Sequence, residues 1–238
     1  MSEKLDGVRA YWNGSGQFVS RQGNRYFAPP WFVAGLPALA LDGELWLARK
    51  AFQRTVSIVR RQDESERWRE IRFLVFDAPQ AQGVFENRLA LVQDCFARHK
   101  PPFAQVLDQK RCRNTAQLDS ELSRIVALGG EGIMLRQPGS VYEAGRSSTL
   151  LKVKRFQDAE ARVTGHQSGT GRHKDRLGAL RVMLPDGIEF AVGTGFTDAQ
   201  REAPPPVGSL ITFRFQELTD GGVPRFPSFV RTCPAAGE

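Results

Sequence analysis

The feature that most constrains this fold is a change of pattern after Phe156. From there on, short runs of β-forming residues alternate with clusters of glycine, proline and aspartate, which are typical of turns. The runs cover residues 161–166, 177–184, 188–192, 210–215 and 225–230. Five strands in roughly 80 residues predict a small antiparallel barrel.

The first part of the chain mixes two periodicities. Residues 8–12 and 17–21 flank Asn13-Gly14 and predict a β-hairpin, and residues 39–47, 71–76, 132–136 and 149–154 predict further strands. Two apolar series at helical spacing predict helices, and they comprise Phe85, Leu89, Val92 and Phe96, then Leu118, Leu122, Ile125 and Leu128. We therefore expect an α+β domain at residues 1–155 and an all-β domain at 156–238. The oligonucleotide-binding (OB) barrel is the commonest such module on nucleic-acid proteins.

Charge separates the same two parts. Residues 1–156 carry 24 basic and 16 acidic side chains, whereas residues 157–238 carry 9 and 10. A basic domain favours phosphate-rich partners, because neutralising each phosphate releases counterions. The three cysteines lie far apart in the sequence. An odd and sparse set of this kind excludes a disulfide framework, and the cysteines lack the paired spacing of a zinc site. No apolar run is long enough to span a membrane, so we expect no membrane partner.

Five short strings in the first part of the chain contain the candidate residues for chemistry. They are Lys4-Leu5-Asp6-Gly7-Val8-Arg9, Leu41-Asp42-Gly43-Glu44-Leu45, Leu74-Val75-Phe76-Asp77, Glu131-Gly132-Ile133-Met134-Leu135 and Leu150-Leu151-Lys152-Val153-Lys154. Each string alone is a moderate signal, but chance rarely produces the full set in this order. Together the strings resemble the motifs of covalent nucleotidyltransferases, namely polynucleotide ligases and mRNA capping enzymes.

The overall match resembles the minimal bacterial ATP-dependent DNA ligases. The resemblance implies an α+β nucleotidyltransferase (ATP-grasp-like adenylation) domain followed by a small all-β OB-fold domain. It also implies three steps: adenylation of a lysine by ATP, transfer of AMP to the 5′-phosphate at a nick, and attack by the 3′-hydroxyl. We accordingly expect ATP as cofactor, nicked duplex DNA as partner and a monomeric enzyme.

Lys4 is the candidate nucleophile. An amine attacks phosphorus only when it is neutral, so cationic neighbours and desolvation must lower its pKa from the usual ~10.4. Arg9, Lys152 and Lys154 are expected to supply that positive field and to neutralise phosphates, and strand alternation places Lys152 and Lys154 on one face. By resemblance these residues bind the nucleotide, together with Glu3.

Glu44 and Glu131 are the candidate metal ligands. Mg²⁺ prefers a few oxygen ligands completed by phosphate and water, and Mn²⁺ is an alternative. By resemblance Glu131 binds the metal, while Glu44 contacts either the metal or the ribose. Phe76 lies in an apolar run typical of a core strand, but by resemblance its ring stacks on adenine.

The resemblance also assigns residues to the rest of the substrates. Arg21 matches a contact to the 5′-phosphate at the nick. Near its end the chain has the string Arg225-Phe226-Pro227-Ser228-Phe229-Val230-Arg231 in place of the R-x-D-K motif of capping enzymes. By resemblance an arginine of this string orients the leaving pyrophosphate, and the difference leaves open whether it is Arg225 or Arg231. The basic stretch 171–178 lies between two expected barrel strands. We expect Arg172, Lys174 and Arg176 in it to contact DNA phosphates.

Two other functions fit part of this pattern. An RNA ligase or capping-type nucleotidyltransferase shares the lysine string, and a non-catalytic OB-containing nucleic-acid-binding protein would share the barrel. The lysine and both glutamates argue against the second, because a binding module has no need of an amine at that spacing. The visible chain indicates a cytoplasmic protein, or a periplasmic one if an upstream leader has been removed.

Overall fold

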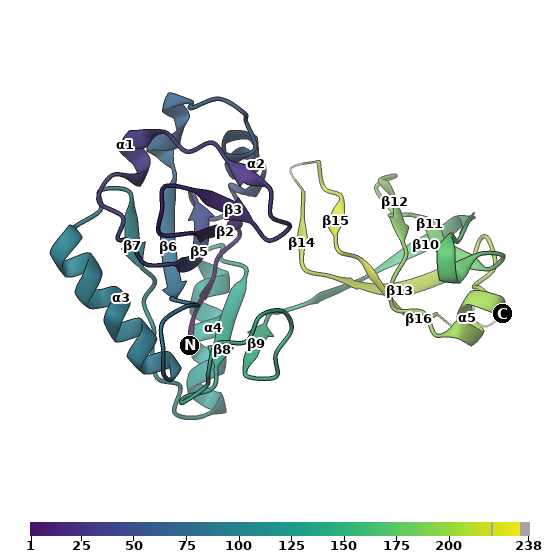
Figure 1. Ribbon diagram of the computed structural model, residues 1–238. Coiled ribbons are helices and arrows are strands. Elements are labelled where there is room, and N and C mark those ends of the chain that lie inside the picture. Colours follow the sequence, from purple (N-terminus) through teal and green to yellow (C-terminus); the bar gives the residue numbers. More distant parts are fainter. Residues whose placement is uncertain (220, 234–238) are drawn as a thin grey trace. The chain divides into compact units, whose positions relative to one another are not determined.

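The computed structural model describes residues 1–219 and 221–233. The chain forms two compact units, Met1–Lys154 and Arg155–Glu238 (Figure 1). Among the helices of the described residues, none combines the length and apolar character of a membrane-spanning segment.

A six-stranded sheet forms the centre of the first unit. Its strands are β2 (Val8–Trp12), β3 (Phe18–Ser20), β4 (Arg25–Tyr26), β5 (Leu41–Trp46), β6 (Arg72–Asp77) and β7 (Ala104–Val106). They lie in the order β4-β3-β2-β5-β6-β7, and only the β6–β7 pair is parallel. The β2–β3 pair confirms the hairpin predicted around Asn13-Gly14.

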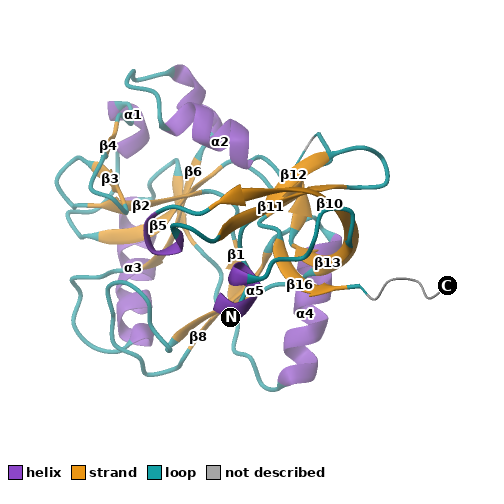
Figure 2. Cartoon of the chain, turned by 90° about the vertical axis from the view of Figure 1, so that its right-hand side faces the viewer, coloured by secondary structure: helices purple, strands orange, loops and turns teal. Residues whose placement is uncertain are grey.

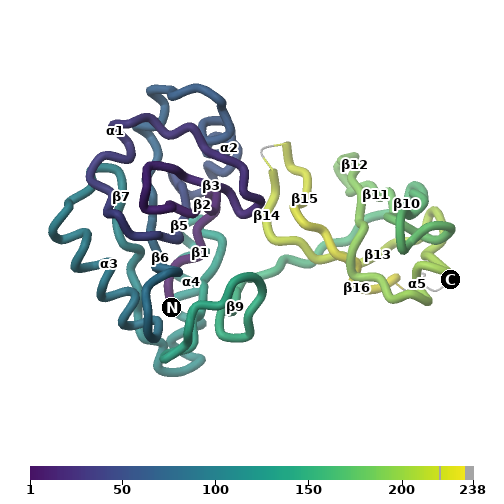
Figure 3. The backbone as a smooth tube through the Cα atoms, in the orientation of Figure 1, coloured from purple at the N-terminus to yellow at the C-terminus, as the bar shows by residue number. Residues whose placement is uncertain are grey.

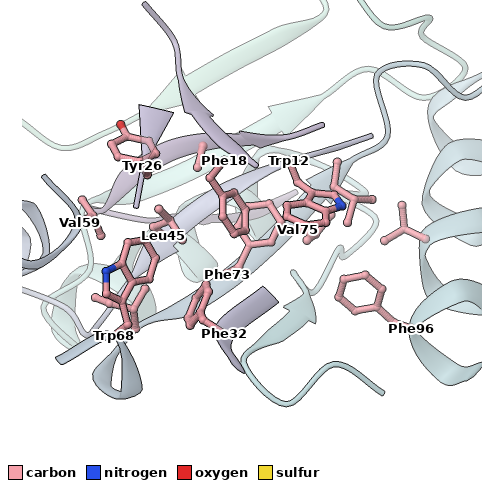
Figure 4. Close-up of a cluster of buried hydrophobic side chains, with 14 of the residues drawn as sticks. Trp12, Phe18, Tyr26, Phe32, Leu45, Val59, Trp68, Phe73, Val75 and Phe96 are labelled. Carbon is pink, nitrogen blue, oxygen red and sulfur yellow. The ribbon is translucent and has the colours of Figure 1, made fainter. Parts of the chain in front are cut away.

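Helices cover this sheet. They are α1 (Pro30–Val33), α2 (Phe52–Val59), the 3-10 helix η1 (Glu66–Glu70) and α3 (Phe85–His99). α3 packs on β6 and β7, and α2 packs on β2 and β5. The core between these layers is rich in aromatic rings (Figure 4): Phe18 lies 4.8 Å from Phe73, and Phe32 lies 4.8 Å from Trp68, measured between ring centroids. Burial of such rings is the main stabilising contribution to this layer.

A smaller antiparallel sheet holds the ends of the first unit together. It consists of β1 (Ser2–Lys4), β8 (Gly132–Arg136) and β9 (Leu150–Val153), with β8 in the middle. Helix α4 (Thr115–Ala127) packs on β8. The Asn114 side chain caps α4 by accepting from the Gln117 N–H, and Gly129 follows its end with a left-handed φ of 79°. α4 confirms the helix that the apolar series beginning at Leu118 predicted.

The second unit is a barrel of five strands. They are β10 (Gln157–Ser168), β11 (Leu177–Met183), β12 (Glu189–Val192), β13 (Leu210–Phe215) and β16 (Ser228–Thr232), in the order β12-β11-β10-β13-β16. Thr194, just beyond β12, forms a parallel bridge with Ser228 of β16. Because this bridge joins the two edge strands, the sheet closes, as an OB barrel requires.

Three elements of the second unit differ from the sequence expectation. A short helix, α5 (Asp198–Glu202), lies between β12 and β13, and a 3-10 turn, η2 (Gly171–His173), lies between β10 and β11 (Figure 2). The strand expected at 225–230 is divided between β15 (Pro224–Arg225) and β16. β15 pairs with β14 (Glu217–Leu218) in a separate hairpin, whose path Figure 3 traces.

Candidate active site

Lys4 and Glu131 meet at one end of the small sheet. Lys4 is the last residue of β1 and lies opposite Gly132, the first residue of β8. The Glu131 carboxylate forms ion pairs with the ammonium groups of both Lys4 and Lys154. The three side chains are only 10–17% exposed. Lys4 of β1 and Lys154, the residue directly after β9, therefore converge on one carboxylate.

Gly132 makes this convergence possible. Its φ is 153°, and a Cβ atom there would lie 2.3 Å from the Val153 carbonyl oxygen. Any side chain would push β9 away from β8, and Lys152 and Lys154 would move away from Lys4 with it. The glycine of this string is thus required by the close approach of backbones.

Arg9 is held by a buried acid. It points from β2 to Asp42 of β5 through two hydrogen bonds, from Nε to Oδ1 at 3.0 Å and from Nη2 to Oδ2 at 2.5 Å. The Tyr142 hydroxyl donates to the same Oδ2 at 3.0 Å. The hydrogen bond to Asp42 raises the pKa of Arg9, and burial raises the pKa of Tyr142 to about 12. Both donors therefore keep their protons at any working pH.

Glu44 lies opposite Arg9 in the β2–β5 ladder. Burial raises its pKa to about 8, although the charges of Lys4 and Arg9 and a hydrogen bond from the Gly7 N–H act in the other direction. A carboxyl group in this setting is protonated near neutral pH and ionises readily when a cation arrives.

A cavity of about 430 Å³ opens between these elements within the first unit. Seven of the side chains predicted to bind substrate or metal line it, namely Glu3, Lys4, Arg9, Arg21, Glu44, Phe76 and Lys152. Burial lowers the pKa of Lys152, and the charges of Lys4, Lys154 and Arg21 lower it further. The cavity therefore has a strongly cationic wall, and the Arg9 guanidinium lies 5.8 Å from the Phe76 ring centroid.

Glu3 has a different setting from its neighbour Lys4. Both of its carboxylate oxygens accept from Arg49, each at 2.8 Å. This bidentate pair ties β1 to the segment that follows β5. The side chain of Glu3 is thus engaged in fixing the strand that carries Lys4.

The terminal arginines lie in the second unit, each with a partner there. Arg225 of β15 pairs with Glu217 of β14 at 2.6 Å. The Nε atom of Arg231, in β16, lies 3.5 Å from the Thr212 hydroxyl oxygen. Arg172, Lys174 and Arg176 lie between β10 and β11, at the position in the barrel that the sequence predicted.

Sequence reasoning missed two residues that line the cavity, Tyr142 and Arg136. Tyr142 lies in a loop, and Arg136 lies at the end of the glutamate string. The Arg136 guanidinium lies 3.2 Å from the Asp77 carboxylate, which is fully buried and also pairs with Arg88 at 2.7 Å. The signal for this network was a pair of acids, Asp42 and Asp77, inside apolar strands, since buried acids need partners.

Comparisons with known proteins identify the family of both parts of the chain. Residues 1–154 match the family model of the ATP dependent DNA ligase domain, and residues 168–232 match that of the DNA ligase OB-like domain. A DNA ligase of Haemophilus influenzae is 37% identical over 231 residues, which cover 97% of this chain and 85% of that relative.

Solved structures give the same result. A structure from a study of Lig E DNA ligases superimposes with a TM-score of 0.92 at 43% identity, covering 98% of this chain and 91% of that one. The adenylate of Chlorella virus DNA ligase shares the fold, with a TM-score of 0.56 at 24% identity, covering 99% of this chain and 92% of that one. By its sequence and by both of its domains, the chain belongs to the ATP-dependent DNA ligase family.

Proposed function

We propose that the protein seals nicks in duplex DNA, as a monomer, through a covalent AMP adduct on Lys4. The observation that carries this proposal is the position of Lys4, on a cationic cavity wall and in contact with Glu131. The cavity lies wholly in the first unit, so that unit holds the proposed nucleophile and the cations that line the cavity beside it.

In that step the Lys4 amine, once it has lost a proton, attacks the α-phosphorus of ATP. A nitrogen–phosphorus bond forms while the bond to pyrophosphate breaks, and the leaving group carries the electron pair away. Lys152, Lys154 and Arg9 neutralise the phosphate charge that builds up. Such positioned cations act with most effect where burial excludes water, and burial already lowers the pKa of Lys152.

The remaining nucleotide contacts follow from the cavity wall. The Phe76 ring is a platform for adenine, and the ring of a purine suits its face. Glu44 is placed for the ribose hydroxyls or for the metal. Glu3 supports the site through Arg49 by holding β1 in register. Arg225 or Arg231 is proposed to orient pyrophosphate.

Glu131 and Glu44 fit a Mg²⁺ or Mn²⁺ ion. The described residues contain no group of three or more His, Cys, Asp or Glu side chains able to hold a metal by themselves. Mg²⁺ suits such a site, because it is commonly bound by one or two carboxylates together with substrate phosphates and water. The metal would supply charge neutralisation at the transferred phosphate.

Arg21 is proposed to bind the 5′-phosphate at the nick. It lines the same cavity as Lys4 and is close enough to lower the pKa of Lys152. AMP then passes from Lys4 to that phosphate, and the neighbouring 3′-hydroxyl displaces AMP.

Incubation with α-labelled ATP and Mg²⁺, followed by a denaturing gel, tests the proposal. We expect label on the wild-type protein and none on Lys4→Ala. The same preparations are then offered nicked DNA or nicked RNA, with ATP or GTP. Sealing of RNA ends or labelling by GTP would favour an RNA ligase or a capping-type enzyme, and absence of any label would favour a nucleic-acid-binding protein.

A further inference from the structure

The loop between β10 and β11 is built as a fixed structure, although its sequence resembles a flexible basic insert. The Gly169 N–H donates to the Arg176 carbonyl at 2.8 Å, so the two ends of the loop are joined. Inside, the His173 N–H donates to Thr170 and the Lys174 N–H donates to Gly171. A Cβ atom on Gly169 would lie 2.1 Å from the His173 carbonyl oxygen, so the turn is packed closely.

Arg176 is the side chain that ties this loop to the rest of the barrel. Its Nη1 lies 3.0 Å from the Asp198 carboxylate and 3.9 Å from that of Glu202, both on α5. Its Nη2 donates to the Arg172 carbonyl at 3.0 Å. The Arg176 side chain is 23% exposed, which is far less than its acidic partners, at 76% and 71%. Its guanidinium is therefore engaged by groups of the barrel itself.

Helix α5 is itself anchored, so it is a fixed support. The guanidinium of Arg201, a buried residue, donates to the carbonyls of Leu177 at 2.8 Å, Gly178 at 3.1 Å and Gly193 at 2.9 Å. Thr197 and Gln200 form a capping box at the start of α5. These contacts fix α5 to the first residues of β11 and to the segment after β12.

Arg172 and Lys174 have the opposite character. Both are exposed, and within residues 1–219 and 221–233 neither has an acidic partner. The Nε of Arg172 donates to Nε2 of His173 at 3.0 Å, which uses one donor and leaves the positive charge uncompensated. Two unpaired cations on an ordered turn suit a row of phosphates, because the backbone that carries them is already ordered and only side-chain entropy is lost on binding.

From these contacts we infer that Arg172 and Lys174 contact the phosphates of duplex DNA, while Arg176 is a positioning residue that holds their loop on α5. The inference rests on the proposed function, since the ligand is the DNA that the enzyme seals. It differs from the expectation based on the sequence, in which Arg172, Lys174 and Arg176 all contact DNA phosphates.

The salt dependence of DNA binding separates the two roles. Each phosphate contact contributes about 0.9 to the slope of log affinity against log salt on duplex DNA. Nicked-duplex binding is measured between about 50 and 200 mM salt for Arg172→Ala, Lys174→Ala and Arg176→Met. We expect the first two variants each to lower the slope by about 0.9. Arg176→Met should leave the slope unchanged and weaken binding about two- to fivefold at every salt concentration, as expected for exposed ion pairs.

Matched controls keep the charge. Arg172→Lys and Lys174→Arg should retain the wild-type slope, and Arg176→Lys should recover part of the affinity, because a lysine also pairs with Asp198. Trypsin should cleave the loop faster in Arg176→Met than in the wild type, as the tether to α5 is lost.

Two results would overturn the inference. A slope reduced by about 0.9 in Arg176→Met would make Arg176 a phosphate contact, and unchanged slopes in the other two variants would remove the loop from the DNA interface. Failure of the proposed function is recognised separately, because wild-type protein would then take no label from ATP.

Discussion

Replacing Tyr142 by phenylalanine tests how the site holds Arg9. The change removes only the hydroxyl that donates to Asp42 at 3.0 Å. Asp42 is 2% exposed, so the change leaves a buried carboxylate with one hydrogen-bond donor fewer. A hydrogen bond to a charged group contributes about 1.5–3 kcal/mol. If the transition state of self-adenylation loses this stabilising free energy and the ground state does not, the reaction slows by about 10- to 100-fold.

The assay is single-turnover labelling by ATP, with Tyr11→Phe as the matched control. The Tyr11 hydroxyl accepts from the Gln80 amide at 3.0 Å in an exposed pair, so its loss should change the rate little. A double-mutant cycle with Arg9→Lys shows whether Tyr142 acts through Arg9, because non-additive effects are expected of residues in one network. Equal rates for Tyr142→Phe and Tyr11→Phe, or strictly additive effects with Arg9→Lys, would refute this reasoning.

Four further results are expected. Lys4→Ala should abolish self-adenylation and sealing of ordinary nicks but still seal a nick that already carries AMP; equal loss on both substrates would give Lys4 a structural role. Glu131→Ala should lower adenylation strongly at modest Mg²⁺ with little change in melting temperature, and a rate unchanged across a Mg²⁺ titration would remove Glu131 from the ligands. Arg88→Met should lower the free energy of unfolding in urea by about 3–5 kcal/mol, because it leaves the fully buried Asp77 with Arg136 as its one remaining cationic partner among the described residues; a loss below about 1 kcal/mol would show that Arg136 or water compensates. The raised pKa of Glu44, about 8 against 4.5, means that between these pH values the folded protein binds a proton that the unfolded chain has released. Stability should therefore fall as pH rises through this window, and unfolding at about pH 5 and 8 should show a flatter fall in Glu44→Gln; equal falls would contradict the shift.

Sequence patterns predicted the helices, hairpin and strands whose structure depends on residues close together in the chain. The apolar spacing of α3 and α4, the Asn13-Gly14 hairpin and the turn residues around the barrel strands all have local causes. The strings around Lys4 and Glu131 identified the family, because several unusual residues recur there in a fixed order.

Contacts between distant segments gave no comparable signal. Tyr142 and Asp42 are 100 residues apart, and nothing beside Tyr142 marks it as a partner. The sequence predicts a nucleotide contact for Glu3, which lines the cavity, but no pattern indicated that its carboxylate also binds Arg49, 46 residues away. Helix α5 is only five residues long and is therefore too short to show apolar periodicity. Thr197 and Gln200 have the spacing of a capping box, which was the one sequence signal for this helix.

The pairing of β1 with β8 has a consequence for the order in which the enzyme is assembled. Lys4 and Glu131 are separated by 127 residues, so the amine leaves the ribosome long before its carboxylate. At about 5–20 residues per second, the interval is roughly 6–25 s. All six strands of the large sheet end by residue 106, so they can pair during this interval, before Arg136 and Tyr142 are available to Asp77 and Asp42. The strands of the large sheet can thus pair in the nascent chain before the Lys4–Glu131–Lys154 cluster exists, and that cluster forms only when the last residues of the first unit have emerged.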